Sequence, residues 1–250
     1  MIYVMSDIHG NMRRFRSVMD QIRLQPEDTL YILGDVIDRH PYGVELLQEI
    51  MAMPNVKMLL GNHEYMMLNV VAPKGDFCPD YSPRERWYDN HGRATRRAFN
   101  KLPQEERWAI VQYLRDLPLN IDIEVNGVQY KLVHAAPIEW YSEQCYDSVE
   151  EYAVWERLPE RIRDTDYVMI QGHTPTMFFQ YGNPLSIWYG KNRIDLDCGS
   201  GFDDGFTRHR TFRPAGRLAC LRLDDMKAFY SEEYAGRKAQ TGGENKPDLN

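Results

Sequence analysis

The 250-residue chain contains no apolar run near the roughly 18 residues that a membrane-spanning helix requires. Its first residues, MIYVMSD, show no basic region followed by an apolar one, so no secretory signal is expected. Cysteine is scarce, and the four cysteines lie far apart without a Cys-x-x-Cys pair. That spacing argues against a disulfide framework and against a zinc ribbon. Together these absences predict a cytoplasmic protein with no membrane segment.

Positive charge is also in short supply. The chain has 30 lysines and arginines against 37 aspartates and glutamates, which gives a formal charge of −7. A protein that holds nucleic acid by a broad basic surface has the opposite balance, so no stable nucleic-acid binding is expected. Hydrophobic residues make up 43% of the chain, and this fraction is too high for a wholly disordered polypeptide.

Short apolar segments alternate with amphipathic ones in the first part of the chain. Strands are predicted at 2–5, 29–33 and 56–60, with helices at 12–23 and 43–51 between them. This order predicts a mostly parallel sheet that is covered on both faces. Further strands are predicted at 121–125, 128–133, 167–170, 193–196, 218–223 and 228–230. The Asn126-Gly127 pair between two of these strands indicates a type I′ hairpin.

The domain organisation follows from changes in composition. Residues 1–232 are predicted to form one domain, with a helical insertion at about 73–118 that contains helices at 85–100 and 103–116. Residues 81–97 of this insertion mix arginine with aromatic side chains, which can steer a phosphorylated substrate or a nucleotide. A solvated helix face is the alternative interpretation. Residues 233–250 have almost no large apolar side chain and are predicted to be a disordered tail.

Five polar clusters begin where predicted strands end. They contain Asp7 and His9; Asp35, Asp38 and Arg39; Asn62, His63 and Glu64; His134; and His173. The carboxyl ends of strands in open α/β sheets are where ligands bind, and Asp, His and Asn supply ligands for divalent metals. Asp7 and His9 are two residues apart, so on an extended strand their side chains share one face. The clusters therefore predict a metal site.

The ordered set of motifs resembles a known family. Asp7-x-His9, Gly34-Asp35-x-x-Asp38-Arg39, Gly61-Asn62-His63-Glu64, His134 and Gly172-His173 are similar to the motifs of the calcineurin-like metallophosphoesterase superfamily. Within it, the chain most resembles the bacterial and phage branch of the PPP-type serine/threonine protein phosphatases, over about residues 1–225. The resemblance implies an α/β fold with two mixed β-sheets packed face to face and flanked by helices, an α/β/β/α sandwich.

The resemblance also implies a role for each site residue. The first metal would be held by Asp7, His9 and Asp35, and the second by Asp35, Asn62, His134 and His173. His63 would be the general acid, with Asp38 as its carboxylate partner, and Arg39 and Arg157 would bind phosphate. The role of Arg157 rests on a short match after Trp155, for which a solvated helix arginine is the alternative. The implied cofactors are two divalent metal ions, Mn²⁺ first, with Fe, Zn, Ni or Co as alternatives.

The implied function is a dinuclear-metal-dependent phosphatase in which a metal-bridged hydroxide attacks a phosphomonoester. The expected substrate is a phosphoprotein (Ser/Thr, and also Tyr) or a small phosphoester. The alternatives are a symmetrical diadenosine-polyphosphate hydrolase, another nucleotide phosphoesterase or nuclease, and a non-catalytic scaffold on the same fold. Diadenosine hydrolases commonly carry Ala and Asp where this chain has Asp38 and Glu64, so the motif details favour a protein phosphatase.

Overall fold

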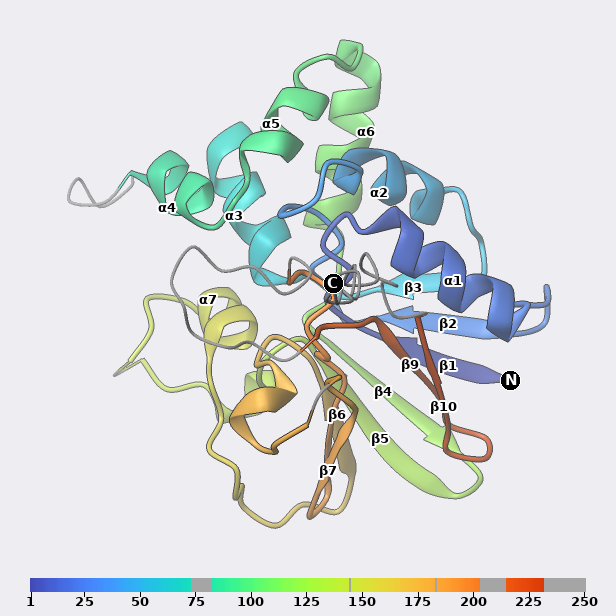
Figure 1. The fold of residues 1–250 in the computed structure, drawn as a ribbon. Coiled ribbons are helices and arrows are strands. Elements are labelled where there is room, and N and C mark those ends of the chain that lie inside the picture. Colours follow the sequence, from blue (N-terminus) through green and yellow to red (C-terminus); the bar gives the residue numbers. More distant parts are fainter. Residues whose placement is uncertain (73–81, 144, 183, 203–214, 232–250) are drawn as a thin grey trace, which may run out of the picture.

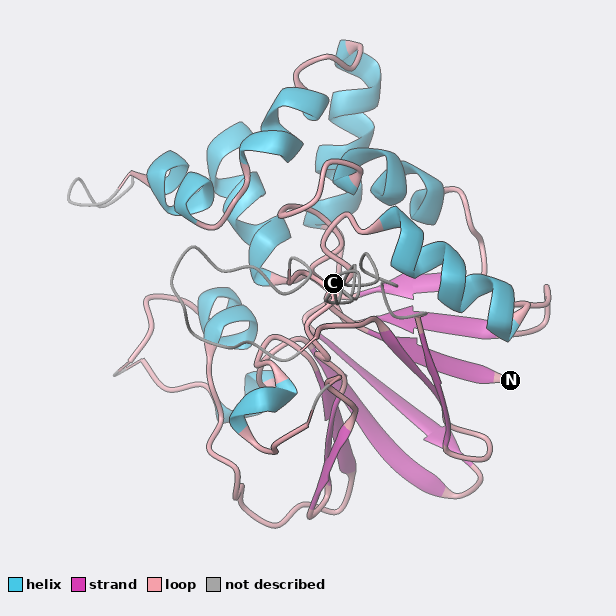
Figure 2. Cartoon of the chain, viewed as in Figure 1, coloured by secondary structure: helices cyan, strands magenta, loops and turns pink. Residues whose placement is uncertain are grey.

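Two five-stranded sheets of mixed strand direction form the centre of the protein (Figures 1 and 2). The computed structural model describes residues 1–72, 82–143, 145–182, 184–202 and 215–231. The predicted fold of two mixed sheets flanked by helices is confirmed. The tail that is predicted at 233–250 lies outside the described residues.

The first sheet contains the strands of the N-terminal part and two late strands. Its members are β1 (Ile2–Met5), β2 (Thr29–Ile32), β3 (Val56–Met58), β9 (Ala219–Arg222) and β10 (Lys227–Tyr230). Their order is β10-β9-β1-β2-β3. The first three strands run parallel, with Ile2 opposite Thr29 and Leu30 opposite Val56, whereas β9 is antiparallel to β1. Parallel pairing brings the ends of β1, β2 and β3 to one edge of the sheet.

The second sheet has the order β4-β5-β6-β8-β7. Its strands are β4 (Asn120–Val125), β5 (Val128–Val133), β6 (Val168–Gln171), β7 (Trp188–Gly190) and β8 (Arg193–Asp195). The turn between β4 and β5 has positive φ at both Asn126 (51°) and Gly127 (79°), which confirms the predicted hairpin. β5, β6 and β8 run parallel to one another.

Helices cover the outer faces of both sheets. They are α1 (Met12–Ile22), α2 (Gly43–Met51), α3 (Asn62–Val71), α4 (Pro83–Asp89), α5 (Arg93–Phe99), α6 (Gln104–Arg115) and α7 (Val149–Trp155), with short 3₁₀ turns at Ile138–Trp140 and Thr176–Phe178. The single helix predicted at 85–100 is wrong, because His91 adopts φ of 68° and separates α4 from α5. Within the described ranges, no helix combines the length and the apolar character needed to cross a bilayer.

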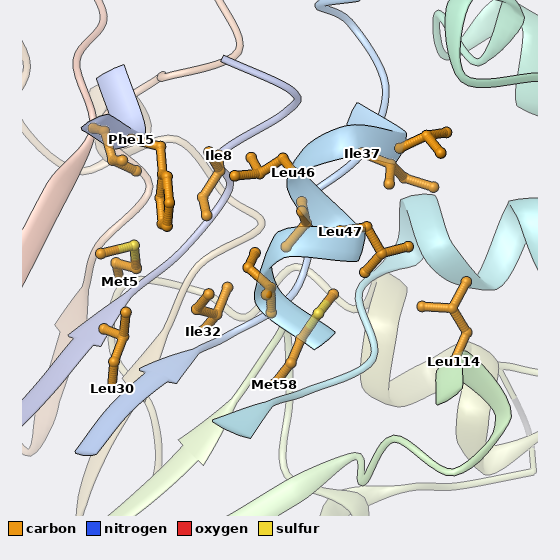
Figure 3. Packing of buried hydrophobic residues seen from close by; sticks show 14 of the residues in the cluster. Met5, Ile8, Phe15, Leu30, Ile32, Ile37, Leu46, Leu47, Met58 and Leu114 are labelled. Carbon is orange, nitrogen blue, oxygen red and sulfur yellow. The ribbon is translucent and has the colours of Figure 1, made fainter. Parts of the chain in front are cut away.

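Alternation along β1 explains the layers. Tyr3 and Met5 face the helices, and Figure 3 shows Met5 in the core with Phe15 and Leu46. Val4 points to the other side, where it packs with residues of the second sheet such as Ile170. The expectation that both faces of the first sheet are covered is confirmed, with helices on one face and the second sheet on the other. A smaller apolar cluster joins that second sheet to α7, which Figure 1 shows apart from the other helices.

Candidate metal centre

The predicted polar clusters follow β1, β2 and β3 in one sheet and β5 and β6 in the other. The structure brings the clusters of the two sheets together. His134 Nδ1 lies 2.7 Å from the carbonyl oxygen of Leu33, the residue that follows β2, and the backbone N–H of His173 donates to Asp7 Oδ2 at 3.0 Å. The site therefore lies at the edge where the carboxyl ends of both sets of parallel strands meet.

The backbone at this edge is strained. Six of the predicted residues have left-handed conformations, with φ between 54° and 70°: Asp7, His9, Asp35, Asp38, Arg39 and His173. Each such conformation in a non-glycine residue costs about 1–3 kcal/mol and is typical of functional sites. The expectation that Asp7 and His9 share the face of an extended strand is wrong, because β1 ends at Met5. The two side chains still meet, with His9 Nε2 3.7 Å from Asp7 Oδ1.

Glycine permits the close approach of these segments. Gly34, two residues after the end of β2, has φ of 99°, and a Cβ there would lie 2.6 Å from Gly61 Cα. The same Cβ would lie 2.9 Å from Nδ1 of His134. A side chain at position 34 would therefore push the three segments apart, and glycine is required next to Asp35.

Asp35 offers a different oxygen to each of two groups of side chains. Its Oδ2 lies 3.7 Å from His9 Nε2, while its Oδ1 lies 3.6 Å from His134 Nε2. On the second side, Asn62 Oδ1 lies 3.0 Å from His134 Nε2 and 2.9 Å from His173 Nδ1. A carboxylate with one oxygen directed at each group could serve as a ligand on both sides of a site for two metal ions.

The three histidines of these groups have their outer nitrogens fixed. Each outer nitrogen faces a backbone carbonyl: His9 Nδ1 faces Ile37 (3.2 Å), His134 Nδ1 faces Leu33 (2.7 Å) and His173 Nε2 faces Trp155 (3.2 Å). Because a carbonyl only accepts hydrogen bonds, the outer nitrogen must carry the proton. The inner nitrogens therefore present lone pairs to the cluster, which is how proteins orient histidine ligands of metals.

These lone pairs meet other acceptors. The inner nitrogens of His134 and His173 both face the side-chain amide oxygen Oδ1 of Asn62, so three acceptors converge with no proton between them. The buried Nε2 of His9 has no hydrogen-bond partner among the described residues. A cation satisfies such a set of acceptors, and the combination of Asp, His and Asn suits Mn²⁺, Fe²⁺ or Zn²⁺. The residues present thus fit divalent metal ions.

Burial favours the neutral form of the histidines, which metal binding needs, but it opposes the ionisation of Asp35. It lowers the pKa of His9 and of His173 well below the ordinary value, so both imidazoles are neutral at pH 7. Burial, with a contribution from Asp7, raises the pKa of Asp35 well above its usual range. Neutral histidine is the form that binds metals, and a cation would offset the cost of an ionised Asp35 in this buried place.

His63 and Asp38 form a buried pair beside the first group. His63 Nδ1 lies 2.7 Å from Asp38 Oδ2, and the opposite nitrogen, Nε2, lies 3.8 Å from Asp35 Oδ2 with no hydrogen-bond partner in the described part of the chain. Burial lowers the pKa of His63 to about 4 and raises that of Asp38 to about 7. The pair therefore lies beside the candidate metal ligands, and within the described residues Nε2 of His63 is available for proton transfer.

The two arginines predicted to bind phosphate lie near different parts of the site. Arg39 is half-buried, and its positive charge contributes to the lowered pKa of His9. Arg157 is exposed after the end of α7, and its charge contributes to the lowered pKa of His173. Its guanidinium lies 5.8 Å from the ring centre of Phe178. The structure thus brings both arginines to the site, while phosphate binding by them stays a prediction.

Glu64 has a structural role that sequence reasoning missed. Its two carboxylate oxygens accept from the backbone N–H groups of Asp35 (2.9 Å), Val36 (2.9 Å) and Ile37 (3.2 Å). Its side chain is completely buried. Glu64, on the first turn of α3, therefore holds the loop that carries Asp35. The sequence marked Glu64 by its position next to His63, but gave no sign of these contacts.

Trp87 and Thr95, in the predicted insertion, were also missed. Trp87 Nε1 donates to Asp38 Oδ2 at 2.7 Å, and the N–H of Asp38 donates to Thr95 Oγ1 at 3.0 Å. No spacing in the sequence relates Asp38 to side chains 49 and 57 residues later. Residues 81–97 had a single signal, the mixture of arginine with aromatics.

A buried carboxylate shared between two imidazole-containing groups, at the joined edge of two sheets, is typical of metal-dependent hydrolases that use two ions. The chain belongs to the calcineurin-like phosphoesterase family, whose model matches residues 1–202. The resemblance to the calcineurin-like metallophosphoesterase superfamily is confirmed. The family implies divalent metal ions, which agrees with the two donor groups.

Individual relatives are similar over different extents. A symmetrical bis(5′-nucleosyl)-tetraphosphatase from Erwinia tasmaniensis is 39% identical over 75 residues, which are 29% of this chain and 27% of that protein. The chain thus spans about a quarter of the length of the curated relatives it matches. A crystal structure of a candidate diadenosine tetraphosphatase superposes with a TM-score of 0.61 at 15% identity, covering 94% of both chains. The cold-active protein-tyrosine phosphatase of a psychrophilic Shewanella gives 0.52 at 16% identity, covering 92% of this chain and 80% of that one. These two structural likenesses show the shared fold.

Proposed function

We propose that the protein hydrolyses phosphate monoesters, with phosphoserine and phosphothreonine residues of proteins as its main substrates. The observation that carries the proposal is the buried His63–Asp38 pair, 2.7 Å apart, whose free Nε2 lies beside the metal groups. An alkoxide such as the serine side chain is a poor leaving group and needs a proton as it departs. A paired histidine at this place is suited to supply it.

The two groups of donor side chains suggest which residues would hold each metal ion. Asp7, His9 and Asp35 would hold the first ion, while the second would lie among Asp35, Asn62, His134 and His173. When bound, the ions supply positive charge for the phosphate and lower the pKa of the attacking water. Manganese is the proposed metal, because this mixture of oxygen and imidazole donors suits it.

Side chains of the protein would bind the phosphate group and donate a proton to the leaving group. The attacking water gives up one proton to solvent and forms the new P–O bond, while the ester P–O bond breaks and its electron pair leaves on the alkoxide. His63 Nε2 gives that alkoxide its proton, and Asp38 keeps the imidazole in place and stabilises its charged form. Burial, together with the charge of Arg39, lowers the pKa of His63 to about 4, but a bound phosphate dianion favours the protonated imidazole. Arg39 and Arg157 would bind the remaining phosphate oxygens.

Hydrolysis of symmetrical dinucleoside polyphosphates is the second candidate. It is supported by the segment that is 39% identical to a symmetrical bis(5′-nucleosyl)-tetraphosphatase. The His63–Asp38 pair favours the ester, since the leaving group of an anhydride is a phosphate that needs little protonation. The two candidates share the same metal centre and differ in the leaving group.

One substrate panel separates the candidates. The protein with Mn²⁺ is assayed on a phosphoserine peptide, a phosphotyrosine peptide, diadenosine tetraphosphate and bis-nitrophenyl phosphate. The proposal expects the highest kcat/KM on a phosphopeptide. Dominant cleavage of diadenosine tetraphosphate would contradict it and support the second candidate, and dominant cleavage of the diester would indicate a phosphodiesterase. Chelation of the metal with EDTA is the control and should abolish each activity.

A further inference from the structure

Two helices of the insertion reach the carboxylate that pairs with His63. Trp87, on α4, donates its indole N–H to Asp38 Oδ2 at 2.7 Å, and this is the same oxygen that lies 2.7 Å from His63 Nδ1. Thr95, on α5, accepts the backbone N–H of Asp38 at 3.0 Å. Asp38 is thus fixed at its backbone by one helix and at its carboxylate by the other.

These contacts are built into the core. Trp87 is completely buried, Thr95 is 1% exposed and Asp38 is completely buried. The N–H of Gly92 donates to the carbonyl of Trp87 at 2.9 Å, and a Cβ at position 92 would overlap the indole ring. The indole therefore has one position, determined by the turn between α4 and α5, and its N–H has a fixed direction.

Asp38 needs such support for two reasons. Its backbone has φ of 70°, a conformation that a non-glycine residue keeps only when its surroundings hold it there. Its other carboxylate oxygen, Oδ1, has no hydrogen-bond partner among the described residues. Without the indole N–H, the bond to His63 would be the remaining side-chain restraint on the carboxylate that the structure shows.

We infer that Trp87 is a positioning residue, which fixes the Asp38 carboxylate and thereby directs His63 Nε2 at the leaving oxygen. The inference rests on the proposed function, in which His63 delivers a proton. The insertion would then take part in proton delivery, because α4 and α5 hold the carboxylate that pairs with the general acid His63. This role comes in addition to the packing of these helices on the apolar core. Thr95 supports the same carboxylate through the backbone.

Trp87→Phe tests the inference, because it keeps a buried aromatic ring and removes the N–H. On a phosphoserine peptide, kcat should fall about 10–100-fold, a part of the 10²–10⁴-fold that acid catalysis supplies. On nitrophenyl phosphate, whose leaving group needs little protonation, kcat should fall less than about threefold. KM should stay the same on both. Trp108→Phe is the matched control, since Trp108 is 60% exposed on α6 and should change neither rate.

Other outcomes would overturn the inference. An equal loss on both substrates would show that Trp87 acts through general stability, and no loss on either would show that the N–H is dispensable. A double-mutant cycle adds a second measure: in an Asp38→Ala background, Trp87→Phe should cause no further loss, and additive losses would contradict the inference. If Trp87→Phe does not fold, Thr95→Val and Thr95→Ser replace it, with the leaving-group-dependent loss expected in the valine variant alone.

The same assays keep the two proposals apart. If the unmodified protein with Mn²⁺ hydrolyses neither ester, the proposed function fails and the role of Trp87 fails with it. If the unmodified protein is active and His63→Asn shows the leaving-group dependence while Trp87→Phe does not, the proposed function stands and the positioning role alone is wrong.

Discussion

Asp35 belongs to both groups of candidate metal ligands, and each of its oxygens faces one group. Asp35→Asn keeps the shape of the side chain but removes its negative charge and replaces one carboxylate oxygen with an amide NH2 group, which is a hydrogen-bond donor. We expect turnover to fall more than about 100-fold, beyond the upper end of losses from changes around metal ligands. Isothermal titration should show weaker binding of both Mn²⁺ ions. Asp166→Asn, on an exposed residue, is the control, and near-normal activity of Asp35→Asn would rule out the shared role.

The role of the His63 imidazole, acid or metal ligand, can be tested by substitution. One of its ring nitrogens lies within 4.8 Å of donor atoms of His9 and Asp35, and Nε2 lies 3.8 Å from Asp35 Oδ2. His63→Asn should reduce kcat on a phosphoserine peptide by about 10²–10⁴-fold and on nitrophenyl phosphate much less, as expected for loss of a general acid. The affinity for Mn²⁺ should be retained. A large loss of Mn²⁺ affinity would identify His63 as a ligand, and equal losses on both substrates would argue against the acid.

Single residues were predicted where chemistry and position coincide in the sequence. The candidate ligands follow apolar strands and have ligand chemistry, so their order alone indicated the site. The left-handed backbones of Asp7 and His9 could not be predicted, because they depend on hydrogen bonds to a neighbouring segment, such as His9 N–H to the Asp35 carbonyl at 2.9 Å. Trp87 could not be assigned either, since its partner Asp38 lies on a distant element.

At the level of elements, α3 and the loop after β2 form one unit through Glu64. The Glu64 carboxylate accepts three backbone N–H groups of this loop, and the loop carries Asp35. Glu64→Gln leaves at least one of these buried donors unpaired, which should lower the free energy of unfolding of the metal-free protein by about 2–4 kcal/mol. Urea denaturation measures it.

Glu105→Gln, on the exposed start of α6, is the matched control for that measurement and should stay within about 0.5 kcal/mol of the unmodified protein. A Glu64→Gln variant as stable as this control would show that the loop is held by other contacts. Because the loop positions Asp35, the variant should also bind Mn²⁺ more weakly.

Elements with strong local patterns were predicted, and those that depend on distant partners were not. The spacing of apolar residues indicated α1 and α2, and β5 was predicted with its observed bounds. β7 has three residues and forms because Trp188 pairs with Asp195 of β8, a contact that no local pattern shows. The break between α4 and α5 likewise depends on a single left-handed residue, His91.

At the scale of the whole molecule, the first sheet illustrates what sequence cannot distinguish. Its strands are apolar on both faces, so burial on both sides was correctly expected. Whether a helix or a second sheet provides the cover is decided by pairing between residues far apart in the chain, such as Val4 with Leu221. The two-sheet architecture therefore came from the family resemblance and was confirmed by the structure.

The buried titratable groups should lower the free energy of unfolding of the metal-free protein both at low pH and at high pH. Burial lowers the pKa of His63 to about 4, so the unfolded chain binds its proton first, and stability is lost as pH falls below the unfolded value of about 6.5. Burial raises the pKa of Asp38 to about 7 and, with Asp7, that of Asp197 to about 8. These carboxyls are easier to ionise when unfolded, so stability is lost as pH rises from about 4 through these values.

The pKa of Asp35 is also raised by burial, so Asp35 adds to the loss of stability as pH rises. Metal ions should offset the contribution of Asp35, because a bound cation favours ionised Asp35 and neutral histidines. The gain in Tm from Mn²⁺ should therefore be small at pH 5.5 and larger at pH 8. At an Mn²⁺ concentration of about 100 Kd the stabilisation is about 2.7 kcal/mol, which corresponds to roughly 5–10 °C for a chain of this size. Differential scanning fluorimetry with Mn²⁺ or EDTA at both pH values measures the difference, and Asp35→Asn should show little gain at either. Equal gains at both pH values would mean that metal binding is not linked to the ionisation of these buried groups.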